Sequence, residues 1–135
     1  MAEPLTCGVH HVGLSVPDLD LAVNFFRDVL GWKVIGRMDE YPGAVVSDGT
    51  VMVTLWRVAN PSTATPFDRR ANVGLHHLAL AVPDEMALMS TYAKVSAHSS
   101  VEIEYAPGPV GPGTDVKHFI CQKPGGLRLE FIPRA

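Results

Sequence analysis

The stretch that decides the fold is His10-His11-Val12-Gly13-Leu14-Ser15-Val16-Pro17-Asp18, which returns 66 residues later as His76-His77-Leu78-Ala79-Leu80-Ala81-Val82-Pro83-Asp84. Six of the nine positions are identical, including the His-His pair and the Val-Pro-Asp ending. A match of this length indicates an internal repeat. The 135 residues are therefore predicted to hold two modules, about 8–58 and 74–133, joined by a linker over 59–73.

Each module reads as a strand, a helix and three further strands. Apolar residues alternate over 10–16, as in a half-buried strand, and then recur at helical spacing over 22–30. Asp18 is a candidate N-cap of this helix, and Gly31 is typical of a helix end. The remaining expected strands are 32–37, 44–48 and 51–58 in the first module, and 75–82, 101–105, 115–121 and 127–132 in the second, whose helix is expected over 85–97.

This order predicts an α+β fold in which residues 1–135 form a single domain of two βαβββ modules in tandem. In each module the helix covers one face of the sheet, so the other face needs a partner. We expect the two modules to form a curved mixed sheet around a cleft.

Composition excludes several classes of protein. Apolar residues make up 47% of the chain and charged residues 19%, which favours a packed core over disorder. The net charge of −3 provides no basic surface for nucleic acid, and no apolar run approaches the ~20 residues that span a bilayer. The N-terminus lacks the pattern of a secretory signal, and Cys7 and Cys121 are too few for a disulfide scaffold. We expect a cytoplasmic protein that binds a small molecule, and neither nucleic acid nor a membrane.

Strand alternation predicts which side chains line the uncovered sheet face. In the two opening strands this face carries His11 or His77, each followed by small residues that leave room for a ligand. In the last strand, Glu130 lies on the face opposite to its apolar neighbours, and its repeat equivalent in the first module is Thr54. Met52 and Trp56 share the face of Thr54 and would form an apolar wall.

Two modules related by a pseudo-twofold axis would bring His11, His77 and Glu130 to one cleft. Two imidazoles and one carboxylate suit Fe(II), Mn(II), Ni(II), Co(II) or Zn(II). Such a set leaves positions open for water or substrate, as a catalytic metal requires. We therefore expect one divalent transition metal held by these three residues.

The repeated openings, together with the closing Lys123-Pro124-Gly125-Gly126-x-x-x-Glu130, resemble the vicinal oxygen chelate superfamily. This superfamily contains glyoxalase I, extradiol dioxygenases, methylmalonyl-CoA epimerase, and fosfomycin and bleomycin resistance proteins. The resemblance covers nearly the whole chain and implies the same three metal ligands and a homodimer. It also implies that His10 and His76, one residue before the ligands, point to the other sheet face, while His118 and Ile120 face the cleft.

The resemblance leaves the reaction open. At the position of Thr54 in this chain, glyoxalase I has a glutamate and the epimerases have a glutamine. At the position of Ile120, the extradiol dioxygenases have a tyrosine. The fosfomycin resistance enzymes have a threonine at Gly13, and the bleomycin-binding members lack the metal ligands.

Our leading prediction is a glyoxalase-like lyase or isomerase that moves a proton on a small substrate with two adjacent oxygens. His118 and Glu130 are the expected catalytic residues, and the expected substrate-binding residues are Met52, Thr54, Trp56 and Ile120. The alternatives are an extradiol-type Fe(II) dioxygenase and a metal-free protein that binds a drug or aromatic ligand. The Arg69-Arg70 pair is expected to be a solvated loop pair rather than a site for an anionic substrate.

Overall fold

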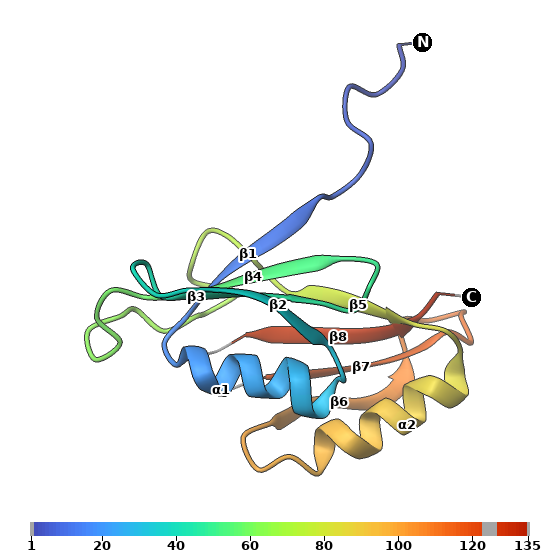
Figure 1. Ribbon diagram of the computed structural model, residues 1–135. Helices are drawn as coiled ribbons and strands as arrows, with labels where there is room; N and C mark the ends of the chain where they lie inside the picture. The colour runs from blue at the N-terminus through green and yellow to red at the C-terminus, as the bar shows by residue number, and fades with distance from the viewer. Residues whose placement is uncertain (1, 123–126, 135) are drawn as a thin grey trace. The chain divides into compact units, whose positions relative to one another are not determined.

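The computed structural model describes residues 2–122 and 127–134. The chain divides into two compact units, unit 1 over Met1–Ser62 and unit 2 over Thr63–Ala135. Each unit contains a four-stranded mixed sheet with its helix against one face (Figure 1). The predicted α+β fold with two βαβββ modules is confirmed. The closing segment Lys123 to Gly126, which contributed to the resemblance, lies outside the described residues.

Unit 1 has the strand order β1-β4-β3-β2, in which β1 pairs with β4 in parallel and the other pairs are antiparallel. Its elements are β1 (His11–Val16), α1 (Leu19–Asn24), η1 (Phe25–Val29), β2 (Lys33–Met38), β3 (Gly43–Ser47) and β4 (Met52–Arg57). The β1–β4 register places Gly13 opposite Thr54, and Ser15 opposite Trp56. The face predicted to bind a ligand is therefore built from these two neighbouring strands.

The helical segment of unit 1 differs from the single regular helix that was predicted. It begins as expected, because the Asp18 carboxylate accepts a hydrogen bond from the Leu21 amide at 3.0 Å. From Phe25 it widens into the π-helical turn η1, in which the Leu30 amide donates to the Phe25 carbonyl at 3.2 Å. The adjacent Phe25 and Phe26 are both fully buried, whereas Leu30 is only half-buried.

Unit 2 repeats the topology, with the strand order β5-β8-β7-β6 and a parallel β5–β8 pair. Its elements are β5 (Leu78–Val82), α2 (Glu85–Ser96), β6 (Glu102–Pro109), β7 (Lys117–Gln122) and β8 (Arg128–Pro133). The Asp84 carboxylate caps α2 by accepting from the Ala87 amide at 2.8 Å. Strand β5 begins later than predicted, so His76 and His77 precede it, and β6 runs past 105 to Pro109 with register irregularities.

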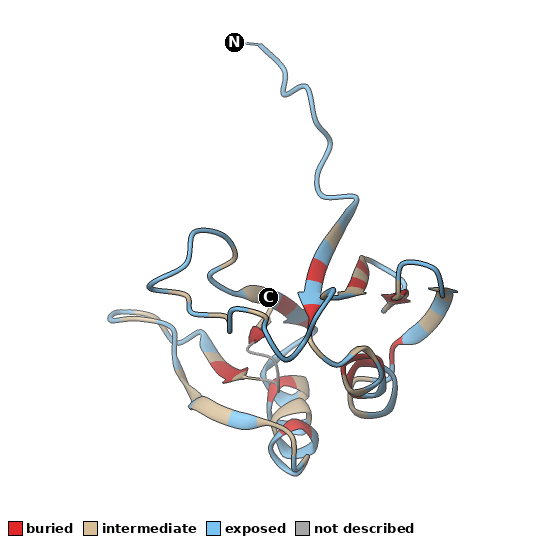
Figure 2. Ribbon diagram, turned by 90° about the vertical axis from the view of Figure 1, so that its left-hand side faces the viewer, coloured by how far each residue is buried: buried red, intermediate tan, exposed pale blue. Residues whose placement is uncertain are grey.

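The core of each unit lies between its sheet and its helix (Figure 2). In unit 2, the fully buried Phe119 ring stacks on Phe131 at 4.7 Å and meets the edge of Tyr92 from α2 at 5.2 Å. Because successive strand residues point to opposite faces, this packing directs His118 and Glu130 to the face that α2 does not cover. In the described part of the chain, no helix is long and apolar enough to cross a membrane.

Gly43 provides a test of the packing on the corresponding face of unit 1. A Cβ atom added there would lie 2.6 Å from Cε3 of Trp56 and 3.0 Å from the Leu55 carbonyl oxygen. We predict that Gly43→Ala displaces the indole and lowers the free energy of unfolding by about 1–3 kcal/mol, measured by urea denaturation. Gly36→Ala is the control, because its Cβ would meet its nearest neighbour at 4.0 Å. Equal stability of the two variants would contradict the close approach of Trp56.

Candidate metal-binding and catalytic site

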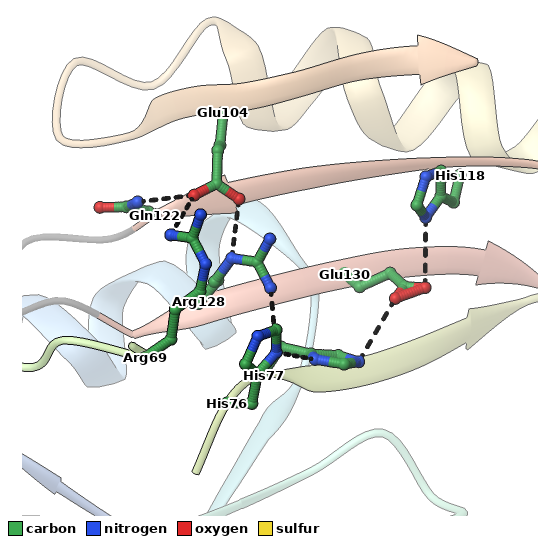
Figure 3. A network of polar contacts seen from close by, with 8 residues as sticks. All are labelled: Arg69, His76, His77, Glu104, His118, Gln122, Arg128 and Glu130. Carbon is green, nitrogen blue, oxygen red and sulfur yellow. Dashed lines mark hydrogen bonds and ion pairs between the residues drawn. The ribbon is translucent and has the colours of Figure 1, made fainter. Parts of the chain in front are cut away.

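Glu130 is the centre of the candidate site in unit 2. Strand β8 places it between Ala79 of β5 and Ile120 of β7, and its side chain is only 14% exposed. One carboxylate oxygen, Oε1, lies 3.5 Å from Nε2 of His77, and the other, Oε2, lies 3.3 Å from Nδ1 of His118 (Figure 3). The structure thus brings two histidines singled out in the sequence to the two oxygens of one carboxylate.

His118 and Ile120 lie on strand β7 beside Glu130. The His118 side chain is 13% exposed and its ring centroid lies 5.4 Å from that of Tyr105 on β6. Ile120 is buried and pairs directly with Glu130 in the sheet. The even sequence spacing from Glu130 therefore placed His118 on the correct face, while the catalytic role of His118 stays a prediction.

The donor set and spacing in unit 2 fit part of a metal site. Two ligand atoms that are each ~2.1 Å from a tetrahedral metal are about 3.4 Å apart. The separation of 3.5 Å between His77 Nε2 and Glu130 Oε1 is close to this value. Within the described residues, no group of three or more His, Cys, Asp or Glu side chains forms a metal site. The third predicted ligand, His11, is an exposed residue of unit 1 at the start of β1.

The uncovered face of unit 1 contains the other predicted binding residues. Trp56 donates a hydrogen bond from its indole nitrogen to Oγ1 of Thr54 at 3.0 Å, which fixes the two side chains to each other. Trp56 also lines an open pocket of ≈ 340 Å³ together with Ser15 and Tyr41. Half-buried Met52 pairs with His11 at the start of the two strands.

Tyr41 is a pocket residue that sequence reasoning missed. Its ring meets the edge of the Trp56 ring with centroids 5.1 Å apart, and the residue is 66% exposed. It precedes strand β3 in a turn, where strand alternation makes no prediction about direction. An aromatic residue next to the turn-forming Pro42 and Gly43 was the signal available in the sequence.

The resemblance implied that His10 and His76 point to the other sheet face, but the ring of each contacts the ring of the next histidine. In unit 1, Nδ1 of His10 lies 2.9 Å from Nδ1 of His11, and in unit 2 the corresponding atoms of His76 and His77 are 2.8 Å apart. The rule that neighbouring side chains point to opposite faces holds within a strand. His10 and His76 precede β1 and β5, so their rings are able to turn toward the next histidine.

The expectation that Arg69 is a solvated loop residue also differs from what the structure shows. It forms an ion pair with Glu104 of β6 at 2.9 Å, and the other oxygen of Glu104 accepts from Nε of Arg128 at 2.7 Å. Gln122 donates a further hydrogen bond to Glu104 at 3.0 Å, and Arg128 reaches Nδ1 of His76 at 3.3 Å (Figure 3). These four residues, Arg69, Glu104, Gln122 and Arg128, are called the Glu104 network below.

The network shifts two pKa values. Burial by itself would raise the pKa of Glu104, but hydrogen bonds from Gln122 and Arg128 and the charges of Arg128 and Arg69 hold it below its usual value. The pKa of His76 is also lowered, first by desolvation and then by the positive charge of Arg128. Near neutral pH, the network therefore pairs a carboxylate with two guanidinium groups beside a neutral His76 ring.

The lowered pKa of Glu104 predicts a pH-dependent contribution to stability. Since its pKa in the folded chain lies below the unfolded value of about 4.3, the contribution is fully present above that value. It is lost as the pH falls through the folded-state pKa. We expect Glu104→Gln to be less stable than the wild type at pH 7 and the difference to shrink below about pH 4. Urea denaturation at several pH values checks this, with the exposed Glu102→Gln as control; a difference independent of pH would contradict it.

Comparisons with known proteins agree with this architecture. The chain is 27% identical to a 2-epi-5-epi-valiolone epimerase from Actinomyces sp., over 96% of this chain and 80% of that protein. It is 30% identical to the mitochondrial methylmalonyl-CoA epimerase of Mus musculus, over 76% of this chain and 67% of that protein. The crystal structure of lactoylglutathione lyase from Agrobacterium tumefaciens has the same fold, with a TM-score of 0.70 at 18% identity, covering 97% of this chain and 96% of that one.

A family model matches residues 8–131, which include the first βαβββ module, the second module up to the middle of β8, and all the candidate site residues. The match thus covers the two repeated openings and most of both sheets. The chain belongs to the Glyoxalase/Bleomycin resistance protein/Dioxygenase superfamily.

Proposed function

We propose that this protein is a divalent-metal-dependent lyase or isomerase that moves a proton on a small substrate with two adjacent oxygens. The observation that carries the proposal is the arrangement of Glu130 between His77 and His118, with one carboxylate oxygen toward each ring. One side of the carboxylate thus offers a pair of metal-binding atoms, and the other side contacts a group that can accept a proton.

His77 and Glu130 are the proposed ligands from unit 2, and His11 is the proposed ligand from unit 1. When bound, a divalent metal polarises substrate oxygens and stabilises negative charge that develops on them. The low exposure of Glu130 strengthens its interaction with a cation, because the surroundings screen charge less than water does.

His118 is the proposed proton-transfer group. When its Nδ1–H donates to Oε2 of Glu130, the neutral ring presents a lone pair at Nε2. The carboxylate orients the ring, and Nε2 can accept a proton from a substrate carbon and return it. Tyr105, whose ring lies beside that of His118, limits the rotation of the imidazole.

Trp56, Thr54 and Met52, with Ile120 in unit 2, are the proposed substrate-binding residues. The hydrogen bond to Thr54 occupies the only polar atom of the indole, so the remaining surface of Trp56 is apolar. Together with Tyr41 and Ser15, it lines a pocket suited to an apolar or planar part of the substrate.

The two epimerase relatives favour proton transfer over dioxygenation. Epimerisation inverts one carbon centre, and removal and return of a proton at a carbon beside a carbonyl group is the simplest way to do so. We also propose that the protein acts in the cytoplasm as a homodimer. The dimer follows from the family resemblance and is checked by light scattering.

Two measurements on protein purified without chelators test the proposal. We expect nickel, cobalt, zinc or manganese by elemental analysis. In D₂O we expect NMR to show deuterium entering carbons next to carbonyl groups in a panel of 2-hydroxyketones, hemithioacetals and methylmalonyl-CoA. Bound iron with oxygen uptake on catechols would overturn it in favour of a dioxygenase. Metal-free protein that binds aromatic compounds without any exchange would overturn it in favour of a binding protein.

A further inference from the structure

Arg128 contacts the histidine that precedes the proposed ligand His77. Its Nη1 atom lies 3.3 Å from Nδ1 of His76. A guanidinium group has five N–H donors and no acceptor, so Nδ1 of His76 has to be the acceptor in this contact. The neutral His76 ring therefore carries its hydrogen on Nε2.

The same nitrogen of His76 determines which ring nitrogen of His77 carries the hydrogen. Nδ1 of His77 lies 2.8 Å from Nδ1 of His76, and two nitrogens at this distance share one hydrogen. Since Nδ1 of His76 accepts from Arg128, it carries no hydrogen, and the hydrogen between the two rings belongs to Nδ1 of His77. The one lone pair of His76 Nδ1 is then shared between two donors, in a three-centre hydrogen bond. The neutral His77 ring then has its lone pair on Nε2, the atom that lies 3.5 Å from the Glu130 carboxylate.

We propose that Arg128 and His76 are positioning residues that hold His77 in the tautomer with the hydrogen on Nδ1 and the lone pair on Nε2. The tautomer itself follows from contacts within unit 2. Its consequence for metal binding rests on the proposed function: a lone pair beside a carboxylate is ready to bind a divalent cation, whereas an Nε2–H would block it.

The Glu104 network explains why Arg128 can fix a tautomer. The side chain of Arg128 is only 10% exposed, and its Nε is held by Glu104 at 2.7 Å. Glu104 is held in turn by Arg69 from the segment that leads into His76, and by Gln122 of β7. The carboxylate that holds the guanidinium is therefore itself held by two other residues, and the position of the Arg128 donor is set by this network.

The internal repeat provides a natural comparison. In unit 1, His10 and His11 have the same contact between Nδ1 atoms, at 2.9 Å. The repeat equivalent of Arg128 there is Met52, which has no N–H donor in its side chain. Arg128, which determines which of the two Nδ1 atoms is the acceptor, is thus present beside His76, whereas Met52 stands at the equivalent position beside His10.

The tautomers can be measured in the full chain without any metal. Long-range ¹H–¹⁵N correlation spectra of ¹⁵N-labelled protein distinguish protonated from unprotonated ring nitrogens, at a pH where the rings are neutral. We expect the hydrogen on Nδ1 in His77 and on Nε2 in His76. A His77 ring that carries its hydrogen mainly on Nε2 in the wild type would overturn the inference, whatever the protein binds.

Variants of His76 test whether the contact acts through its acceptor. In His76→Leu we expect His77 to gain the Nε2–H form and the affinity for Co²⁺ to fall about 10–100-fold. His76→Asn keeps an oxygen acceptor near the Nδ1 position and should restore the tautomer and most of the affinity. Arg128→Met, which introduces the residue found in the first module, should mix the tautomers in a folded chain. His10→Leu is the control and should leave the His77 signals unchanged.

The outcomes separate this inference from the proposed function. If the wild type shows the expected tautomers but does not bind Co²⁺, the metal-dependent function fails and the inference stands. If His76→Asn and His76→Leu lose Co²⁺ affinity equally while both remain folded, the acceptor of His76 plays no part and the inference is wrong. If His76→Leu does not fold, the spectra of the wild type and of Arg128→Met still decide whether the inference about the tautomers is correct.

Discussion

Replacing Glu130 by Gln is expected to lower the affinity for Co²⁺ by about 100-fold or more, because outer-shell partners alone contribute 10–100-fold and Glu130 is a proposed ligand. The amide has no negative charge to attract the cation. Its nitrogen is also a donor, which would compete for the lone pair of His77 Nε2, 3.5 Å from the present carboxylate. Titration with Co²⁺ followed by visible absorption measures the affinity.

The fold should survive this change, since glutamine has the shape of glutamate and retains an oxygen that can accept from His118. Thermal unfolding of the metal-free variant checks that point. Glu102→Gln is the control, because it removes the same charge from an exposed position on β6. An unchanged Co²⁺ affinity in a folded Glu130→Gln protein would show that this carboxylate is not a ligand.

The second large effect is expected for His118→Asn. The asparagine amide can still donate to Glu130 from near the position of Nδ1, but it has no counterpart of the Nε2 lone pair. We therefore expect metal affinity to change little and the rate of deuterium exchange into the substrate to fall about 100-fold or more, as for the loss of a general base. NMR exchange rates at saturating metal measure this effect.

The comparison of affinity with rate decides what His118 does. A variant that binds metal weakly but exchanges normally at saturating metal would show that His118 only orients Glu130. His98→Asn is the matched control, because His98 follows α2 and contacts Ser100 rather than Glu130. It should change neither the affinity nor the rate.

Local patterns predicted much of the fold and one half of the site. Alternation in the last strand separated Leu129 and Phe131, which are buried, from Glu130, and even spacing added His118 to the same face. Asp18 caps its helix as predicted, and its repeat equivalent Asp84 caps α2 in the same way. These features depend on residues close together in the chain, whose directions follow from the geometry of a strand or a helix.

The π-helical turn and the Glu104 network were not predictable in this way. The turn begins at two adjacent aromatic residues, Phe25 and Phe26, which are both buried in unit 1 and meet edge to face. The ion pairs of Glu104 join residues separated by 35 positions to Arg69 and by 24 to Arg128. No periodic pattern indicates contacts of this kind, because they depend on the register between strands and on the path of the segment before β5.

By itself, the sequence determined that this chain consists of two βαβββ modules, and it determined which face of each opening and closing strand carries polar side chains. Both follow from the repeat and from the two-residue period of a strand. Only the tertiary structure decided that His76 turns toward His77 and that Arg128 reaches His76. The physical reason is that a hydrogen atom shared between two rings is assigned by a third group, brought beside them by strand pairing rather than by position in the chain.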